Sequence, residues 1–194
     1  MLVQTKPQTY TPEEYFALEE QSETKHEYHN GEIVPMTGGT TNHNRIVINL
    51  VAFLKFAFRG KPLSLFTSDV RLWIPAYDRY TYPDVQIIFG DIIYHEKRKD
   101  TVTNSSVIVE VLSNSTRSYD KGDKFKYYRS LPTFQEYITI NQYGFEVEQY
   151  VKTDDGKWLI TYLEAEDTVL SLASVDFEIP LKDLYDGVNF EEAD

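Results

Sequence analysis

The stretch Ser106-Val107-Ile108-Val109-Glu110-Val111-Leu112 places one carboxylate inside an otherwise apolar run. Such a run is typical of a central strand that is covered on both faces. A buried glutamate without a partner costs about 3 kcal/mol or more, so a cation or hydrogen-bond donors should meet Glu110. The candidate partners are Lys124, Arg117 and a bound metal ion.

A second acid precedes another apolar run. Asp84 follows Pro83 and opens the run Val85 to Phe89, which is also expected to form a central strand. The two strands together place two carboxylates where a sheet usually carries hydrocarbon.

Strand alternation predicts the surroundings of Glu110. Its side chain should lie on the face opposite to the three valines of its strand. A helix is expected from Asp120 to Leu131, ended before Pro132. The four-residue spacing of Asp120, Lys124 and Tyr128 forms one stripe on that helix. Lys124 is therefore the lysine expected to reach Glu110.

Length and composition indicate one folded domain. The chain has 194 residues, 41% of them hydrophobic and 14% aromatic, so we expect a single domain over residues 1 to 194, with the acidic part 153–194 included. No window approaches the roughly 18 apolar residues of a membrane span, and Met1 to Tyr10 lacks a signal-peptide core. A cytoplasmic protein is expected. The absence of cysteine excludes disulfides and thiolate-bound metals.

The negative charge is concentrated near the C-terminus. Of 31 acidic and 19 basic residues, 12 and 2 lie between Thr153 and Asp194, which leaves 19 and 17 for residues 1 to 152. Between Asp91 and Ser130 basic residues are in excess. The formal charge of −12 therefore does not exclude a nucleic-acid partner, although the acidic part would repel one.

Local signals predict the remaining elements. Thr11-Pro12-Glu13-Glu14 matches a capping box that begins a helix ending near Glu20, and Asn30-Gly31 is typical of a tight hairpin turn. The other expected elements are a long helix through Ile46 to Phe58, strands at Leu63 to Phe66 and Asp69 to Ile74, a meander of Glu136 to Asn141, Phe145 to Lys152 and Trp158 to Glu164, and a short helix at Pro180 to Asp186. This order predicts an α/β fold, with helices on both faces of a mixed sheet and a C-terminal antiparallel meander.

The spacing of these residues resembles a known family. Pro83-Asp84, then Glu110 26 positions later, then the Asp120, Lys124 and Tyr128 stripe are similar to the Uma-type restriction endonucleases of the PD-(D/E)xK nuclease superfamily. The resemblance extends to His26-Glu27-Tyr28 with Gly31-Glu32, His43-Asn44-Arg45, Asp69-Val70-Arg71 and Glu136-Tyr137. In the superfamily a lysine usually follows the strand glutamate by two residues, where this chain has Leu112. The resemblance implies that Lys124 on the helix replaces it.

The resemblance implies a restriction-endonuclease-like fold and hydrolysis of DNA phosphodiester bonds with Mg²⁺ or Mn²⁺. Asp84 and Glu110 would be the metal ligands, and Lys124 the residue that orients or helps to deprotonate the attacking water. The implied supporting residues are Glu27, Asp69, Asp120, Tyr128 and His43, and the DNA-contacting candidates are Arg71, Arg117 and Lys121. By analogy with the fold, a homodimer is expected if both strands are cut.

A different reading of the same residues stays open. Glu110 and Lys124 could form a structural ion pair in a nuclease-like scaffold that binds a partner without catalysis. The chain has no His-Glu-x-x-His spacing for a zinc site and no Gly-rich phosphate loop followed by Lys-Ser/Thr. It also has no Gly-x-Ser-x-Gly elbow, although a Ser/His/Asp triad without that motif stays open.

Overall fold

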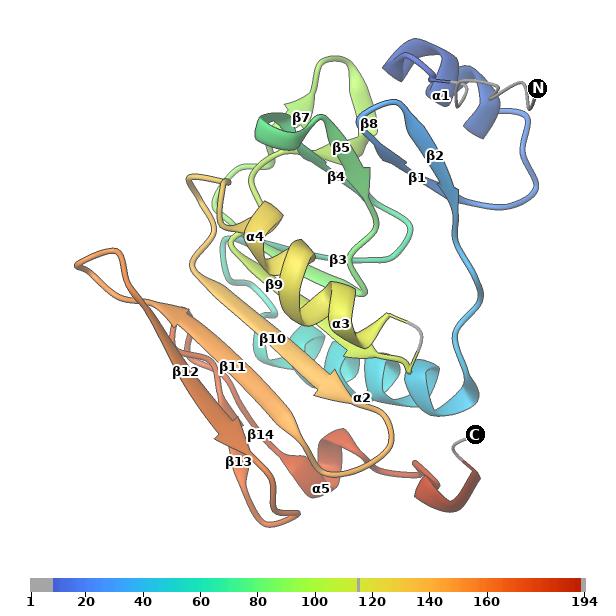
Figure 1. Ribbon diagram of the computed structural model, residues 1–194. Coiled ribbons are helices and arrows are strands. Elements are labelled where there is room, and N and C mark those ends of the chain that lie inside the picture. Colours follow the sequence, from blue (N-terminus) through green and yellow to red (C-terminus); the bar gives the residue numbers. More distant parts are fainter. Residues whose placement is uncertain (1–8, 115, 193–194) are drawn as a thin grey trace.

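Two six-stranded sheets form the frame of the computed structural model, which describes residues 9–114 and 116–192 (Figure 1). The central sheet consists, in spatial order, of β12 (Trp158–Leu163), β11 (Val147–Lys152), β10 (Glu136–Asn141), β9 (Val107–Leu112), β6 (Val85–Phe89) and β3 (Leu63–Thr67). The second sheet consists of β2 (Glu32–Pro35), β1 (His26–His29), β5 (Arg79–Thr81), β4 (Arg71–Ile74), β8 (Arg98–Val102) and β7 (Tyr94–His95). A small antiparallel pair is formed by β13 (Val169–Ser171) and β14 (Glu178–Pro180).

The helices are short apart from one. They are α1 (Pro12–Glu19), α2 (Thr41–Ala57), α3 (Arg117–Tyr119), α4 (Phe125–Tyr128) and α5 (Leu181–Leu184), with 3₁₀ turns η1 (Pro75–Tyr77) and η3 (Phe190–Glu192). A π-helical turn, η2 (Asp120–Lys124), joins α3 to α4. Residues 117–128 thus form one continuous helical segment, which we call the α3–α4 helix.

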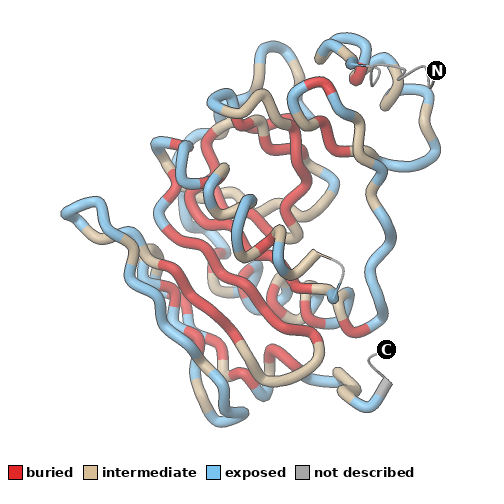
Figure 2. Tube along the Cα trace, in the orientation of Figure 1, coloured by how far each residue is buried: buried red, intermediate tan, exposed pale blue. Residues whose placement is uncertain are grey.

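The central strand β9 separates two apolar cores. Its three valines pack with Ile46, Leu50 and Leu54 of α2 and with residues of α5. Ile108, on the other face, packs with Tyr128 of the α3–α4 helix. Helices therefore lie on both faces of the central sheet, and β9 and β10 are buried along their whole length (Figure 2). The predicted mixed α/β architecture is confirmed.

The sheet directions also match the expectation. β9 runs parallel to β10 and antiparallel to β6, whereas β10, β11 and β12 form the expected antiparallel meander. The hairpin of β1 and β2 turns at Asn30 and Gly31, whose φ angles of 48° and 97° are those that an Asn-Gly turn adopts readily. The capping box of α1 is present, with Thr11 and Glu14 bonded reciprocally.

The second sheet is the main addition to the predicted fold. Its strands β5, β7 and β8 are short and carry few apolar residues in alternation, so their sequences show no clear strand period. Pairing with β1 and β4 holds them in place. The α3–α4 helix begins at Arg117, three residues before the predicted start, and β4 begins at Arg71 instead of Asp69.

None of the helices in the described ranges has the length and apolar character needed to span a membrane. The stretch Met1 to Tyr10, which lacks a signal-peptide core, lies mostly outside those ranges. The last two residues of the predicted domain also lie outside them.

A buried carboxylate fastens the C-terminal part of the chain to the central sheet. Glu136 on β10 is fully buried. Its two oxygens accept hydrogen bonds from Gln149 Nε2 at 2.6 Å, from the backbone N–H groups of Ala173 and Ser174, and from Ser174 Oγ. This single side chain therefore satisfies donors from β11 and from the loop after β13.

We expect Glu136→Ala to lower the free energy of unfolding by about 1–3 kcal/mol or more, because several buried donors lose their acceptor. Urea denaturation followed by circular dichroism measures the change. Glu166→Ala removes an exposed carboxylate from the acidic part 153–194 and serves as the control. Equal midpoints for the two variants would contradict this account of Glu136.

Candidate functional site

Two carboxylates meet where β6 and β9 run side by side. Val85 pairs with Val109, so the next position outward places Asp84 opposite Glu110. Asp84 Oδ2 accepts a hydrogen bond of 2.7 Å from the Val111 N–H and lies 3.1 Å from His43 Nε2 at the start of α2. The acid is thus fixed by β9 and by α2, and 16% of its side chain is exposed.

The α3–α4 helix packs over Glu110 and contacts its carboxyl group. Its Oε1 accepts a hydrogen bond of 2.6 Å from the Tyr128 hydroxyl and lies 3.1 Å from Lys124 Nζ. Burial raises the pKa of Glu110 to about 8; the Lys124 ammonium opposes this rise, and two neighbouring acids add to it. Tyr128, in turn, also contacts Thr81 at the end of β5.

Lys124 lies among three carboxylates. Its Nζ is 3.0 Å from Asp120 Oδ1 as well as 3.1 Å from Glu110, and 12% of its side chain is exposed. Burial alone would lower the pKa of Lys124, but the charges of Glu110, Glu27 and Asp120 outweigh burial and raise it well above the ordinary value. Lys124 is therefore an ammonium at neutral pH, and the contact with Glu110 expected from the helix spacing is present.

Glu27 approaches this cluster from the second sheet. Its Oε2 lies 2.8 Å from His29 Nε2, and its Oε1 accepts a hydrogen bond of 3.3 Å from the Tyr82 N–H. Burial would raise the pKa of Glu27, but His29 and the charge of Lys124 outweigh it and hold the pKa below its ordinary value. His29 was not predicted; its spacing of two from Glu27 on a strand was the signal that could have found it.

Polar atoms without hydrogen-bond partners gather on this face of the central sheet. Within the described ranges, three buried side-chain polar atoms form no hydrogen bond. One of them is Thr139 Oγ1, and another is Asp120 Oδ1, which has the Lys124 ammonium at 3.0 Å. Thr139 stands directly beside Glu110 in the register of β9 and β10. Buried groups of this kind call for water or an ion. Thr139 was also missed, because only the strand pairing places it here.

The donor set fits a hard divalent cation. In the contacts described above, Asp84 uses only its Oδ2 and Glu110 uses only its Oε1. The second oxygen of each acid takes part in none of these contacts. Within the described residues no group of three or more His, Cys, Asp or Glu side chains is arranged to hold a metal ion. Two carboxylates without a third protein ligand suit an ion such as Mg²⁺, which keeps several of its waters.

Two predicted site residues lie elsewhere. Asp69 sits in the turn before β4, is largely exposed, and forms an ion pair with Lys25. Arg71 is buried in the second sheet, where its guanidinium contacts Tyr82 at 2.5 Å and Asp100 at 2.7 Å. These contacts involve none of Asp84, Glu110 and Lys124, and the supporting role of Asp69 and the DNA contact of Arg71 stay predictions.

The two remaining DNA-contacting candidates lie on the α3–α4 helix. Arg117 contacts Glu146 at 2.7 Å, and Lys121 contacts Glu146 at 3.1 Å and Glu148 at 2.5 Å. Both side chains are partly exposed and lie on the helix that carries Lys124. A phosphate could bind them only in competition with Glu146 and Glu148. Their role stays a prediction.

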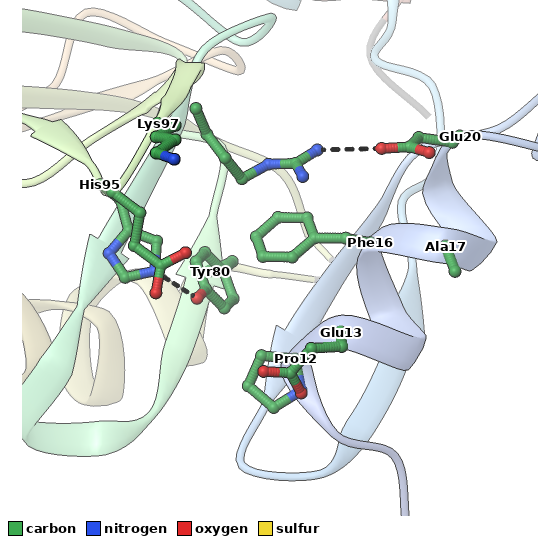
Figure 3. A pocket seen from close by; sticks show the side chains of 10 residues that line it. Pro12, Glu13, Phe16, Ala17, Glu20, Tyr80, His95 and Lys97 are labelled. Carbon is green, nitrogen blue, oxygen red and sulfur yellow. Dashed lines mark hydrogen bonds and ion pairs between the residues drawn. The ribbon is translucent and has the colours of Figure 1, made fainter.

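A pocket of about 680 Å³ opens on the other side of the second sheet, between α1 and the β7–β8 hairpin (Figure 3). Phe16, Tyr80 and Arg98 are among its lining residues. Glu27 alternates with Tyr28, which packs against Tyr80, so the acid cluster and this pocket lie on opposite faces of the sheet. The pocket contains none of the predicted site residues.

Comparison with known proteins gives the family. The family model Uma2, described as "Putative restriction endonuclease", matches residues 12–182. The chain belongs to the Uma2 family. Two Uma2-like relatives from Synechocystis sp. are named "Uncharacterized protein sll1609", 39% identical over 89% of this chain and 98% of the relative, and "Uncharacterized protein slr1290", 36% identical over 93% of each.

A solved structure shares the Uma2 fold seen here. A crystal structure from Anabaena variabilis, described as a putative nuclease belonging to DUF820, superposes with a TM-score of 0.75 at 16% identity and covers 93% of this chain and 99% of its own. The resemblance to the Uma-type group and the restriction-endonuclease-like fold class are both confirmed.

Removing the ammonium should expose the dependence of the fold on Lys124. We expect Lys124→Met to lower the free energy of unfolding by about 3–5 kcal/mol, because buried acids lose their counter-ion. In the Glu110→Gln background the same substitution of Lys124 should cost less, by about 0.5–3 kcal/mol, because the acid that it leaves unpaired is already gone. Urea denaturation measures all three variants.

Lys126→Met is the matched control, since Lys126 is exposed on the same helix. Additive losses in the double variant would show that Glu110 and Lys124 are not energetically coupled.

Proposed function

We propose that this Uma2-family protein is a nuclease that hydrolyses DNA phosphodiester bonds with Mg²⁺ or Mn²⁺ held by Asp84 and Glu110. The observation that carries the proposal is the pairing of these acids on neighbouring strands, with the Lys124 ammonium 3.1 Å from one of them. The family description and the nuclease-like fold support it.

The chemistry that a divalent ion supplies at such a site is neutralisation of the charge that develops on the phosphate and activation of a water molecule. The side chains of the protein do the rest. The Val111 N–H and His43 orient Asp84, and Tyr128 orients Glu110, so that the second oxygen of each acid is available as a ligand.

Lys124 acts through its positive charge in this proposal. Because its pKa is raised well above the ordinary value, it holds its proton at neutral pH. An ammonium among carboxylates can donate to a phosphate oxygen or position a water, whereas it is a poor general base. Of the two roles that the family resemblance implied, the surroundings of Lys124 favour orientation of the attacking water over its deprotonation.

The buried contact of Lys124 with Glu110 and Asp120 also favours a second candidate function. A scaffold stabilised by this ion pair could bind DNA or another partner without cleaving it. The two candidates differ in whether a divalent ion binds and whether DNA is cut.

For the nuclease, we expect Asp84→Asn and Glu110→Gln to abolish Mn²⁺-dependent cleavage of plasmid DNA and to lose the heat of Mn²⁺ binding in calorimetry. His43→Ala and Tyr128→Phe, which only orient the acids, should lower activity or metal affinity roughly 10- to 100-fold. Asp155→Asn removes an exposed carboxylate from the turn between β11 and β12 and is the control with full activity. Wild type that neither binds Mn²⁺ nor cuts DNA would establish the scaffold instead.

The raised pKa of Glu110 predicts a pH dependence of stability. In the unfolded chain a glutamate titrates near pH 4.3, whereas in the folded protein Glu110 keeps its proton up to about pH 8. Between these values the folded state binds more protons, so raising the pH costs stability. Without metal, the melting temperature of Glu110→Gln relative to that of wild type should therefore rise from pH 5 to pH 8. A difference that does not change with pH would contradict the burial argument.

A further inference from the structure

The strand β12 leaves one side of the central sheet open. It is the last strand of that sheet and pairs with β11 on its other side (Figure 1). Leu159, Ile160 and Tyr162 are 60%, 43% and 59% exposed. The strand Trp158–Leu163 contains no charged residue and no proline. Exposed edge strands normally carry such residues to prevent pairing with another chain, so this edge is unprotected.

The backbone of β12 alternates between β11 and the open side. Thr153 N–H donates to the Lys157 carbonyl at 2.8 Å, which fixes the hydrogen-bonded positions of the antiparallel ladder. The regular register then directs the N–H and C=O groups of Leu159, Thr161 and Leu163 towards β11. The corresponding groups of Trp158, Ile160 and Tyr162 point outward.

We propose that β12 pairs antiparallel with the β12 strand of a second copy of this chain, with Ile160 opposite the partner's Ile160. In this register Trp158 faces the partner's Tyr162, and each outward-pointing residue of the strand meets another outward-pointing residue. Side chains that face each other across a ladder share one face of the sheet. Trp158, Ile160 and Tyr162 of the two copies therefore form one continuous apolar row across the interface.

The sequence of the strand favours a second copy over an unrelated chain. The order aromatic, isoleucine, aromatic at Trp158, Ile160 and Tyr162 reads the same in both directions. Such a self-complementary edge is what a two-fold symmetric contact requires.

The pairing also sets the positions of the two candidate sites. The two-fold axis of an antiparallel pair stands perpendicular to the sheet, so the α3–α4 helices of both copies lie on the same side. Trp158 contacts Phe125 of this helix, with ring centroids 5.0 Å apart, and Phe125 directly follows Lys124. The interface is thus joined by one aromatic contact to the segment that carries the ammonium.

Sedimentation velocity at micromolar protein tests the proposal. Wild type is expected to be a dimer, and Ile160→Lys a monomer, because the substitution places two ammonium groups directly opposite each other. Ile48→Lys and Phe56→Lys replace exposed apolar residues of α2 and should remain dimers. A monomeric wild type, a polymer, or a dimer that Ile160→Lys does not disturb would each overturn the proposal.

Disulfide trapping tests the register without relying on the fold of a charged variant. The chain contains no cysteine, so Ile160→Cys introduces one thiol per copy. Directly opposed residues of a ladder have Cα atoms about 5.5 Å apart, within disulfide reach. Mild oxidation should give a covalent dimer for Ile160→Cys and none for Ile48→Cys. Equal cross-linking of both variants, or none in either, contradicts the pairing of β12 with itself.

Discussion

The contact between Glu110 and Lys124 joins the central sheet to the helix that covers it. A carboxylate in the middle of β9 would be costly to bury alone, and the ammonium, the Tyr128 hydroxyl and the raised pKa each reduce that cost. Because the pair is enclosed, the α3–α4 helix must pack in one register. The two apolar cores on either side of β9 are arranged around this constraint.

The second sheet completes the surroundings of the pair. Glu27 on β1 and Thr81 on β5 reach the same cluster, the first through the charge of Lys124 and the second through Tyr128. The acids of the central sheet and those of the second sheet therefore share one counter-ion. A protein with this arrangement has an excess of carboxylates over ammonium groups at one spot, which is the electrostatic condition under which a divalent cation is favoured.

Local sequence determined some features of the site and not others. The apolar runs around Asp84 and Glu110 predicted both strands, and the four-residue helix spacing predicted the contact of Lys124, since each depends on a single element. Thr139 and His29 depend on strand pairing and on a neighbouring sheet. The ion pairs of Arg71 could not be predicted for the same reason: its partners Glu19 and Asp100 lie on α1 and β8, which only the folded chain brings together.

The position of the ammonium on a helix has a mechanical consequence. A lysine at the place of Leu112 would be held by the backbone ladder of the sheet, at a fixed distance from Glu110. Lys124 instead ends a π-helical turn, a local widening that often marks functional sites. Displacing this one helix would change the charge balance around the acids while every hydrogen bond between the strands stays intact. The ammonium and the strand ladder therefore belong to different elements, so whatever touches the helix can tune the site.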